Sequence, residues 1–150
     1  MESGMNRDFV EMLFALSETG ADSLIVGAYA VAAHGHPRAT GDLDIWIRPS
    51  PENAERVFQA LQVFGAPLSN ISQEDLSLPG TVFQIGVSPS RIDILTSRTG
   101  VAFDQAWQNK MAIIIEGREV FCIGLDDLLI NKKATGRPQD LADVDSLENQ

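Results

Sequence analysis

The amino-acid sequence predicts an α/β (α+β) protein in which helices flank a mixed β-sheet, with residues 1–150 forming a single domain. Three observations lead to this fold class. Helix and strand patterns alternate along the whole chain. Two pairs of expected strands are joined by short connections, one of them a hairpin signal. Finally, 150 residues, of which 44% are hydrophobic, suffice for one core and are too few for two domains of ordinary size.

Each element of the first half is predicted by a local signal. Apolar residues at helical spacing, followed by Gly20, predict the first helix. A short apolar run that ends at Gly27 is typical of a buried strand, and the alternation that begins at Asp42 predicts a strand with one acidic face. The pair Ser50-Pro51 predicts a helix start, because it combines a capping residue with a proline at the first helical position. The expected order is a helix over 6–19, a strand over 23–26, a helix over 28–33, a strand over 42–47 and a helix over 51–64.

The second half begins with a long loop. Residues 65–80 contain two prolines and show no sustained period, so one helical turn near Glu74 is all the structure we expect there. The segment Glu116-Gly117-Arg118 lies between two apolar runs and predicts a hairpin. The expected order is strands over 81–87 and 91–95, a helix over 101–109, strands over 111–115 and 119–123, and helices over 125–134 and 138–148.

Charge and cysteine content exclude several classes of protein. The net charge is −10 with a pI near 4.4, whereas a protein that binds many phosphates of a long nucleic acid is normally basic. Bulk DNA is therefore an unfavoured partner. The longest apolar run, residues 24–33, is half the length of a bilayer span, so no membrane partner is expected. The single cysteine, Cys122, cannot form an internal disulfide, and with no signal peptide visible we expect a cytoplasmic protein.

Asp42 and Asp44 are the strongest chemical signal in the sequence. They lie two residues apart on an expected strand, so both side chains point to one face while Leu43 and Ile45 point to the other. Two like charges on one face repel each other and call for a positive partner. Oxygen ligands without sulfur favour Mg²⁺ or Mn²⁺. The alternative is a surface strand whose acidic side chains are simply solvated.

A third carboxylate and a glycine turn strengthen the metal hypothesis. Asp93 lies on the face opposite Ile92 and Ile94, and it joins the acidic pair if its strand lies beside theirs. Three carboxylates could then hold two divalent cations, an arrangement that serves phosphoryl transfer. Upstream, Gly27 and Ala28 mark a strand-to-helix junction whose free N–H groups could receive a phosphate.

The residues 27–35 and 38–45 resemble the core signature of the nucleotidyltransferase superfamily that includes DNA polymerase beta. The most similar branch comprises small bacterial nucleotidyltransferases related to the toxin components of abortive-infection systems. The resemblance continues at residues 91–95 and in the tail, at residues 132–143. It differs at one point, because Ala28 stands where the family usually has serine or glycine, and a hydroxyl that could bind phosphate is therefore missing.

The resemblance implies a role for each residue of the signature. Asp42, Asp44 and Asp93 would bind the metals, and Asp93 would also help to activate the attacking hydroxyl. The residues that the resemblance places at the triphosphate or nucleotide are Gly27, Ala28, Arg38, Thr40 and one of the two lysines Lys132 and Lys133.

The implied activity is metal-dependent transfer of a nucleoside monophosphate from an NTP such as ATP to a hydroxyl group, with release of pyrophosphate. The acceptor stays open among tRNA, a protein and a small molecule. One alternative is a catalytically lapsed protein of the same fold that binds a nucleotide or a protein partner within a toxin–antitoxin pair. Another is a metal-dependent phosphohydrolase, in which the same carboxylates activate water.

Overall fold

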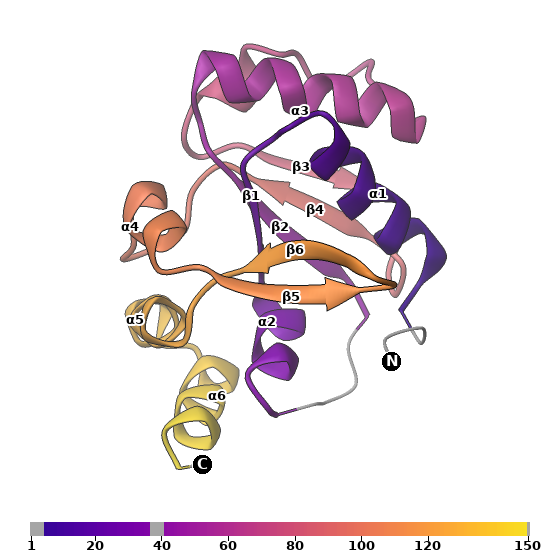
Figure 1. Ribbon diagram of the computed structural model, residues 1–150. Helices are drawn as coiled ribbons and strands as arrows, with labels where there is room; N and C mark the ends of the chain where they lie inside the picture. The colour runs from indigo at the N-terminus through magenta and orange to yellow at the C-terminus, as the bar shows by residue number, and fades with distance from the viewer. Residues whose placement is uncertain (1–4, 37–40, 150) are drawn as a thin grey trace.

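The computed structural model describes residues 5–36 and 41–149. Within them the chain forms a six-stranded mixed sheet in the order β3-β4-β2-β1-β6-β5, with helices packed around it (Figure 1). The predicted fold class is thereby confirmed. The elements are α1 (Arg7–Glu18), β1 (Ser23–Val26), α2 (Gly27–Ala33), β2 (Leu43–Ile47), α3 (Pro51–Phe64), the 3₁₀ turn η1 (Asp75–Ser77), β3 (Val82–Ile85), β4 (Ile92–Leu95), α4 (Phe103–Gln108), β5 (Met111–Ile115), β6 (Arg118–Cys122), α5 (Leu125–Thr135) and α6 (Pro138–Glu148).

Strand β2 lies near the centre of the sheet, between one antiparallel and one parallel neighbour. It pairs antiparallel with β1, where Val26 lies opposite Asp44. It pairs parallel with β4, where Asp44 lies opposite Asp93. Because parallel neighbours need a long crossover, the chain passes through α3, η1 and β3 before it returns as β4. The register of β2 and β4 decides which side chains share one face of the sheet.

The core lies on the face of β2 that alternates with the aspartates. Leu43, Ile45 and Ile47 are fully buried there. Helices α1 and α3 pack against each other and contribute the apolar side of each helix to this core, as their positions in Figure 1 indicate. Helix α3 starts where predicted, because the Ser50 side chain accepts a hydrogen bond from the Asn53 N–H at 3.2 Å.

The acidic face of β2 becomes a buried face after Asp44. Trp46 lies on this same face but is only 1% exposed, and its ring meets Phe103 of α4 edge to face at 5.1 Å. Packing is therefore the role of Trp46, as its position in an apolar strand indicates. Helix α4 covers this end of the strand and leaves the other end, with the aspartates, open.

Three helices lie near the open end of β2. Helix α2 continues directly from β1, and α5 and α6 pack against each other in its neighbourhood (Figure 1). His34 ends α2, and its Nε2 lies 2.8 Å from the Ile123 carbonyl oxygen, which ties α2 to the segment before α5. In the described part of the chain, no helix is both long enough and apolar enough to cross a membrane.

Candidate active-site cleft

The three predicted aspartates meet in one open cleft. Asp44 and Asp93 are register partners on neighbouring parallel strands, and Asp42 lies two residues before Asp44 on the same side. The cleft has a volume of about 760 Å³. Its other lining residues are Gly27, Ala28, Gly41, Arg91, Leu95, Arg98, Lys132, Arg137, Pro138, Gln139, Asp140 and Asp143. Sequence positions more than a hundred residues apart thus contribute to a single site.

The negative charge of Asp44 is only partly compensated by neighbouring residues. Within the described residues, its carboxylate takes part in no hydrogen bond or ion pair. Burial raises the pKa of Asp44 to about 6, and the charges of Asp93 and Asp42 add to this effect, although Arg98 and Arg91 oppose it. A carboxylate in this state favours either a proton or a cation beside it.

Arg91 neutralises the other two aspartates. Its Nε lies 2.8 Å from Asp93 Oδ1, and its Nη2 lies 3.2 Å from Asp42 Oδ2. Asp42 also accepts hydrogen bonds from the Arg91 backbone N–H at 3.1 Å and from Ser88 Oγ at 2.8 Å. The role of Arg91 was not predicted from the sequence. A signal was nevertheless present, since Arg91 and Asp93 lie two residues apart and therefore share one face of the strand.

The donor set suits a hard divalent cation. Three carboxylates contribute oxygen atoms without sulfur or imidazole, which is the chemistry that Mg²⁺ and Mn²⁺ prefer. The raised pKa of Asp44 indicates that the protein alone leaves one of these charges uncompensated. In their present side-chain positions, no three acidic, histidine or cysteine residues of the described segments form a metal-binding cluster. The oxygen atoms of Asp42 and Asp93 are instead engaged with Arg91.

Gly27 allows α2 to begin against Asp44. Its φ of 71° lies in the left-handed region, and a Cβ atom at this position would lie 2.4 Å from Asp44 Oδ2. Any side chain would therefore displace the carboxylate. Ala28 follows at the first turn of α2 and lines the cleft without a hydroxyl group.

The two tail lysines, neighbours on α5, have different surroundings. Lys132 lines the cleft and is only 5% exposed, with its Nζ 2.9 Å from Asp143 Oδ2 and 3.5 Å from Asp140 Oδ1. Lys133 is exposed, pairs with Glu148 at 2.7 Å and is not a lining residue of the cleft. The structure therefore brings Lys132, and not Lys133, to the aspartates. Arg38 and Thr40, the remaining predicted phosphate ligands, lie outside the described residues.

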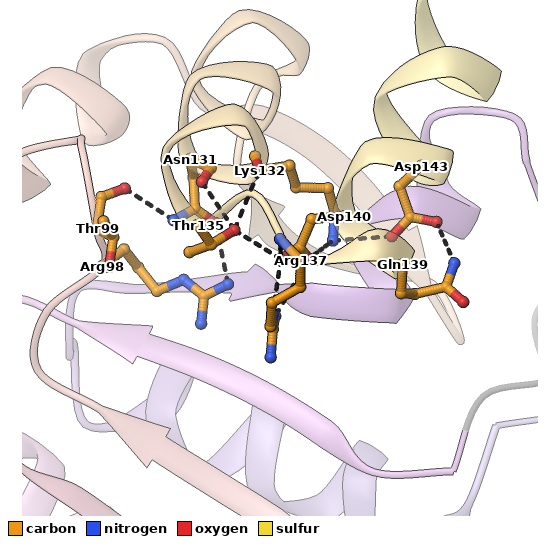
Figure 2. Close-up of polar contacts among 9 residues, drawn as sticks. All are labelled: Arg98, Thr99, Asn131, Lys132, Thr135, Arg137, Gln139, Asp140 and Asp143. Atoms are coloured by element: carbon orange, nitrogen blue, oxygen red, sulfur yellow. Dashed lines mark hydrogen bonds and ion pairs between the residues drawn. The ribbon is translucent and has the colours of Figure 1, made fainter.

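Asp140 organises the helix pair beside Lys132. Its carboxylate accepts hydrogen bonds from Arg137 Nε at 2.6 Å and from Thr135 Oγ1 at 2.7 Å (Figure 2). Burial raises the pKa of Asp140, but these hydrogen bonds outweigh burial and hold it well below the usual range. Asp140 is therefore a permanent anion that fixes the turn between α5 and α6.

Comparisons with known proteins agree on the fold. The family described as "Nucleotidyltransferase of unknown function (DUF6036)" matches residues 8–148. A comparison with curated protein sequences finds no match. The lincosamide antibiotic adenylyltransferase LnuA, solved with lincomycin bound, is similar with a TM-score of 0.63 at 14% identity, over 96% of each chain.

Two structures of the antibiotic-resistance factor ANT(2'')-Ia are also similar. The solution structure has a TM-score of 0.63 at 16% identity and covers 98% of this chain and 84% of its own. The crystal structure with adenylyl-2''-tobramycin has a TM-score of 0.59 at 17% identity and covers 93% of this chain and 84% of its own. At such identities the likeness concerns the fold.

Proposed function

This chain belongs to the DUF6036 family of nucleotidyltransferases, and from that premise we propose that it transfers a nucleoside monophosphate from an NTP to a hydroxyl group in a metal-dependent reaction that releases pyrophosphate. Membership confirms the resemblance drawn from the sequence and makes the protein an enzyme of the nucleotidyltransferase class. The observation that carries the more specific proposal is the register of β2 and β4, which sets Asp44 beside Asp93 at the floor of an open cleft.

Asp42, Asp44 and Asp93 are the residues that would hold Mg²⁺ or Mn²⁺. Such ions polarise phosphoryl oxygens and offset the charge that develops on attacking and leaving oxygens. Asp44 offers the uncompensated charge, because its pKa is raised by burial and by the two neighbouring aspartates. The oxygen atoms of Asp42 and Asp93 that would bind metal also accept hydrogen bonds from Arg91. Metal and Arg91 therefore compete for the same carboxylates.

The remaining chemistry is positioning and proton transfer. The resemblance assigns to Asp93 the further role of accepting the proton of the attacking hydroxyl, and its position on the cleft floor is compatible with that role. Gly27 and Ala28 would present backbone N–H groups to the phosphates, and Lys132 would add a positive charge on the opposite wall. Arg38 and Thr40 keep the phosphate-binding role that the resemblance gives them. Such an enzyme lowers the barrier mainly by orientation and charge compensation.

A small molecule is the first acceptor to test. LnuA was solved with lincomycin, and ANT(2'')-Ia was solved with adenylyl-2''-tobramycin, in which the nucleotide is attached to a small molecule. This chain matches LnuA over 96% of each chain, so the two share one overall architecture. ATP is accordingly the first donor to test, and a hydroxyl-bearing small molecule is the first acceptor. The other acceptor classes to test are tRNA and protein.

The decisive experiment follows the nucleotide label. The protein is incubated with Mg²⁺ or Mn²⁺, each NTP labelled at the α-phosphate, and separate pools of small hydroxyl compounds, tRNA and protein. We expect pyrophosphate release together with label in one pool. Asp44→Asn should abolish both, and Asp126→Asn, an exposed acid in the first turn of α5, should change neither. Release of free phosphate without labelled acceptor would instead identify a phosphohydrolase.

A second candidate function is nucleotide binding without transfer. The observation in its favour is Arg91, whose guanidinium already neutralises two of the three carboxylates. Binding of ATP without pyrophosphate release under any metal condition would identify this function. A place in a toxin–antitoxin pair, with a protein partner, and a cytoplasmic location stay predictions of the sequence.

A further inference from the structure

Arg98 is a cation of the cleft that forms no ion pair with any acidic residue the structure describes. The loop after β4 carries it, and its side chain lines the cleft together with the aspartates. Among the described residues, no carboxylate lies within ion-pair distance of its guanidinium. The other three cations of the cleft wall that the structure describes are all paired: Arg91 with Asp42 and Asp93, Lys132 with Asp143 and Asp140, and Arg137 with Asp140.

The Arg98 side chain is nevertheless held in place. Its Nη2 donates a hydrogen bond of 3.0 Å to Asn131 Oδ1. The Asn131 amide in turn donates to the Thr99 carbonyl oxygen at 2.8 Å, which fixes the orientation of the amide. Asn131 is itself buried within α5. Arg98 is therefore oriented by a neutral residue that contributes no countercharge.

Part of the guanidinium is left without a partner. Arg98 Nε is buried and makes no hydrogen bond within residues 5–36 and 41–149. A buried donor without an acceptor, on a group that is always charged, is costly to the folded protein. Burial lowers the pKa of Arg98 and the charge of Arg137 lowers it further, whereas the charges of Asp44 and Asp140 raise it. The charges of Asp44 and Asp140 therefore do not offset the cost of burying this guanidinium, and an anionic ligand in hydrogen-bond contact with it would reduce that cost.

Arg98 and Arg137 lie beside the same part of the cleft. Both residues line the cleft and also the adjoining pocket that Asn131 and Thr135 border. Figure 2 shows the Arg98 side chain reaching from the loop after β4 to lie below Thr135, while Arg137 extends from the α5–α6 turn toward the sheet. Two like charges repel each other across this position, so an anion between them would relieve the repulsion.

We propose that Arg98, oriented by Asn131, binds the phosphate chain of the NTP, and that the phosphate oxygens form the ion pair that none of the described acidic residues forms with Arg98. This inference rests on the proposed function, since it presumes that the cleft receives a nucleoside triphosphate. Phosphate fits the site because a guanidinium offers several donors in one plane and binds tetrahedral oxyanions at two points. Arg98 is a binding residue here, and Asn131 is a positioning residue that acts through it.

The experiment compares the binding of ATP and of inorganic pyrophosphate in the presence of Mg²⁺, measured by calorimetry on the full chain. Arg98→Gln should weaken both affinities by about tenfold or more, since it removes charged hydrogen bonds to phosphate. Arg98→Lys should recover part of the loss. Arg7→Gln, which removes an exposed arginine that pairs with Glu116, is the matched control and should change neither affinity.

Thermal unfolding without ligand separates binding from a structural role. We expect Arg98→Gln to unfold at the wild-type temperature or above it, because the cost of burying the Arg98 charge outweighs its attraction to Asp44 and Asp140. If wild type binds both ligands and Arg98→Gln binds pyrophosphate within twofold of wild type, the Arg98 inference is wrong and the proposed function survives. If wild type binds ATP and Arg98→Gln does not, but no condition yields transfer, the proposed function fails and the inference stands. If wild type binds neither ATP nor pyrophosphate, the Arg98 inference and the proposed function are both wrong.

Discussion

Asp44 should make the protein less stable as the pH rises, and its amide replacement should reverse this. Burial and two neighbouring aspartates raise the pKa of Asp44 from 3.8 to about 6. Between these two pH values the folded protein binds more protons at this site than the unfolded chain does. The free energy of unfolding therefore falls with rising pH across this window, and Asp44 destabilises the metal-free protein above it.

The size of the effect follows from the shift. A difference of one pKa unit corresponds to about 1.4 kcal/mol. A shift from 3.8 to about 6 therefore sets an upper limit of ~3 kcal/mol, and partial solvation of the side chain lowers our expectation to ~2 kcal/mol. Asp44→Asn keeps the shape of the side chain and removes the charge, so it should raise the stability of the metal-free protein at pH 7.5 by this amount.

Urea unfolding at a series of pH values from 4 to 8, with a chelator and then with Mg²⁺, measures the effect. The quantity of interest is the difference between Asp44→Asn and wild type, because this difference cancels the contributions of carboxylates that do not interact with Asp44. One of these is Asp140, whose lowered pKa acts in the opposite direction. The difference should grow from pH 4 to 6 and level off above pH 6. Added Mg²⁺ should stabilise wild type and not the variant. The reasoning is refuted if Asp44→Asn is the less stable protein at pH 7.5 without metal.

Two further substitutions test the cleft walls. Gly27→Ala should lower the free energy of unfolding by more than Gly117→Ala does. Both positions have positive φ, which costs an alanine ~1 kcal/mol, but only at Gly27 would the new Cβ lie 2.4 Å from a carboxylate oxygen. Equal losses of stability in urea unfolding would contradict this explanation. Lys132→Met should lose ~3 kcal/mol, because it removes the buried cation that lies between the carboxylates of Asp140 and Asp143. Lys133→Met, at an exposed pair, should lose under ~1 kcal/mol, and a loss as large as that of Lys132→Met would refute the assignment.

Local patterns in the sequence predicted most of the elements. The start of α3 at Pro51 was predicted because Ser50 and Pro51 act on their own helix, and no distant residue has to be known. The alternation around Asp42 and Asp44 was equally local, since side chains on a strand change face at every residue. The single turn near Glu74 was found because proline and glycine interrupt any longer period, and η1 lies there.

Tertiary structure decided which of these residues share a site. No pattern within residues 91–95 states that β4 lies parallel beside β2, yet that pairing sets Asp93 against Asp44. The same holds for the ion pair of Arg91 with Asp42, which depends on this register, whereas Asp93 lies only two residues from Arg91 in the chain. No sequence pattern indicated a role for Arg98, because a single arginine after a strand belongs to no motif or periodic pattern.

The sequence by itself therefore determined the elements, the acidic face of β2 and the family signature, all of which depend on residues close together in the chain. The folded structure alone decided that Lys132 turns into the cleft while Lys133 turns out to Glu148, and that Arg98 has no acidic partner there among the described residues. The physical reason is that burial and charge compensation depend on which distant segments pack together. The sequence position of a charged side chain does not state whether an oppositely charged residue packs beside it in the folded protein.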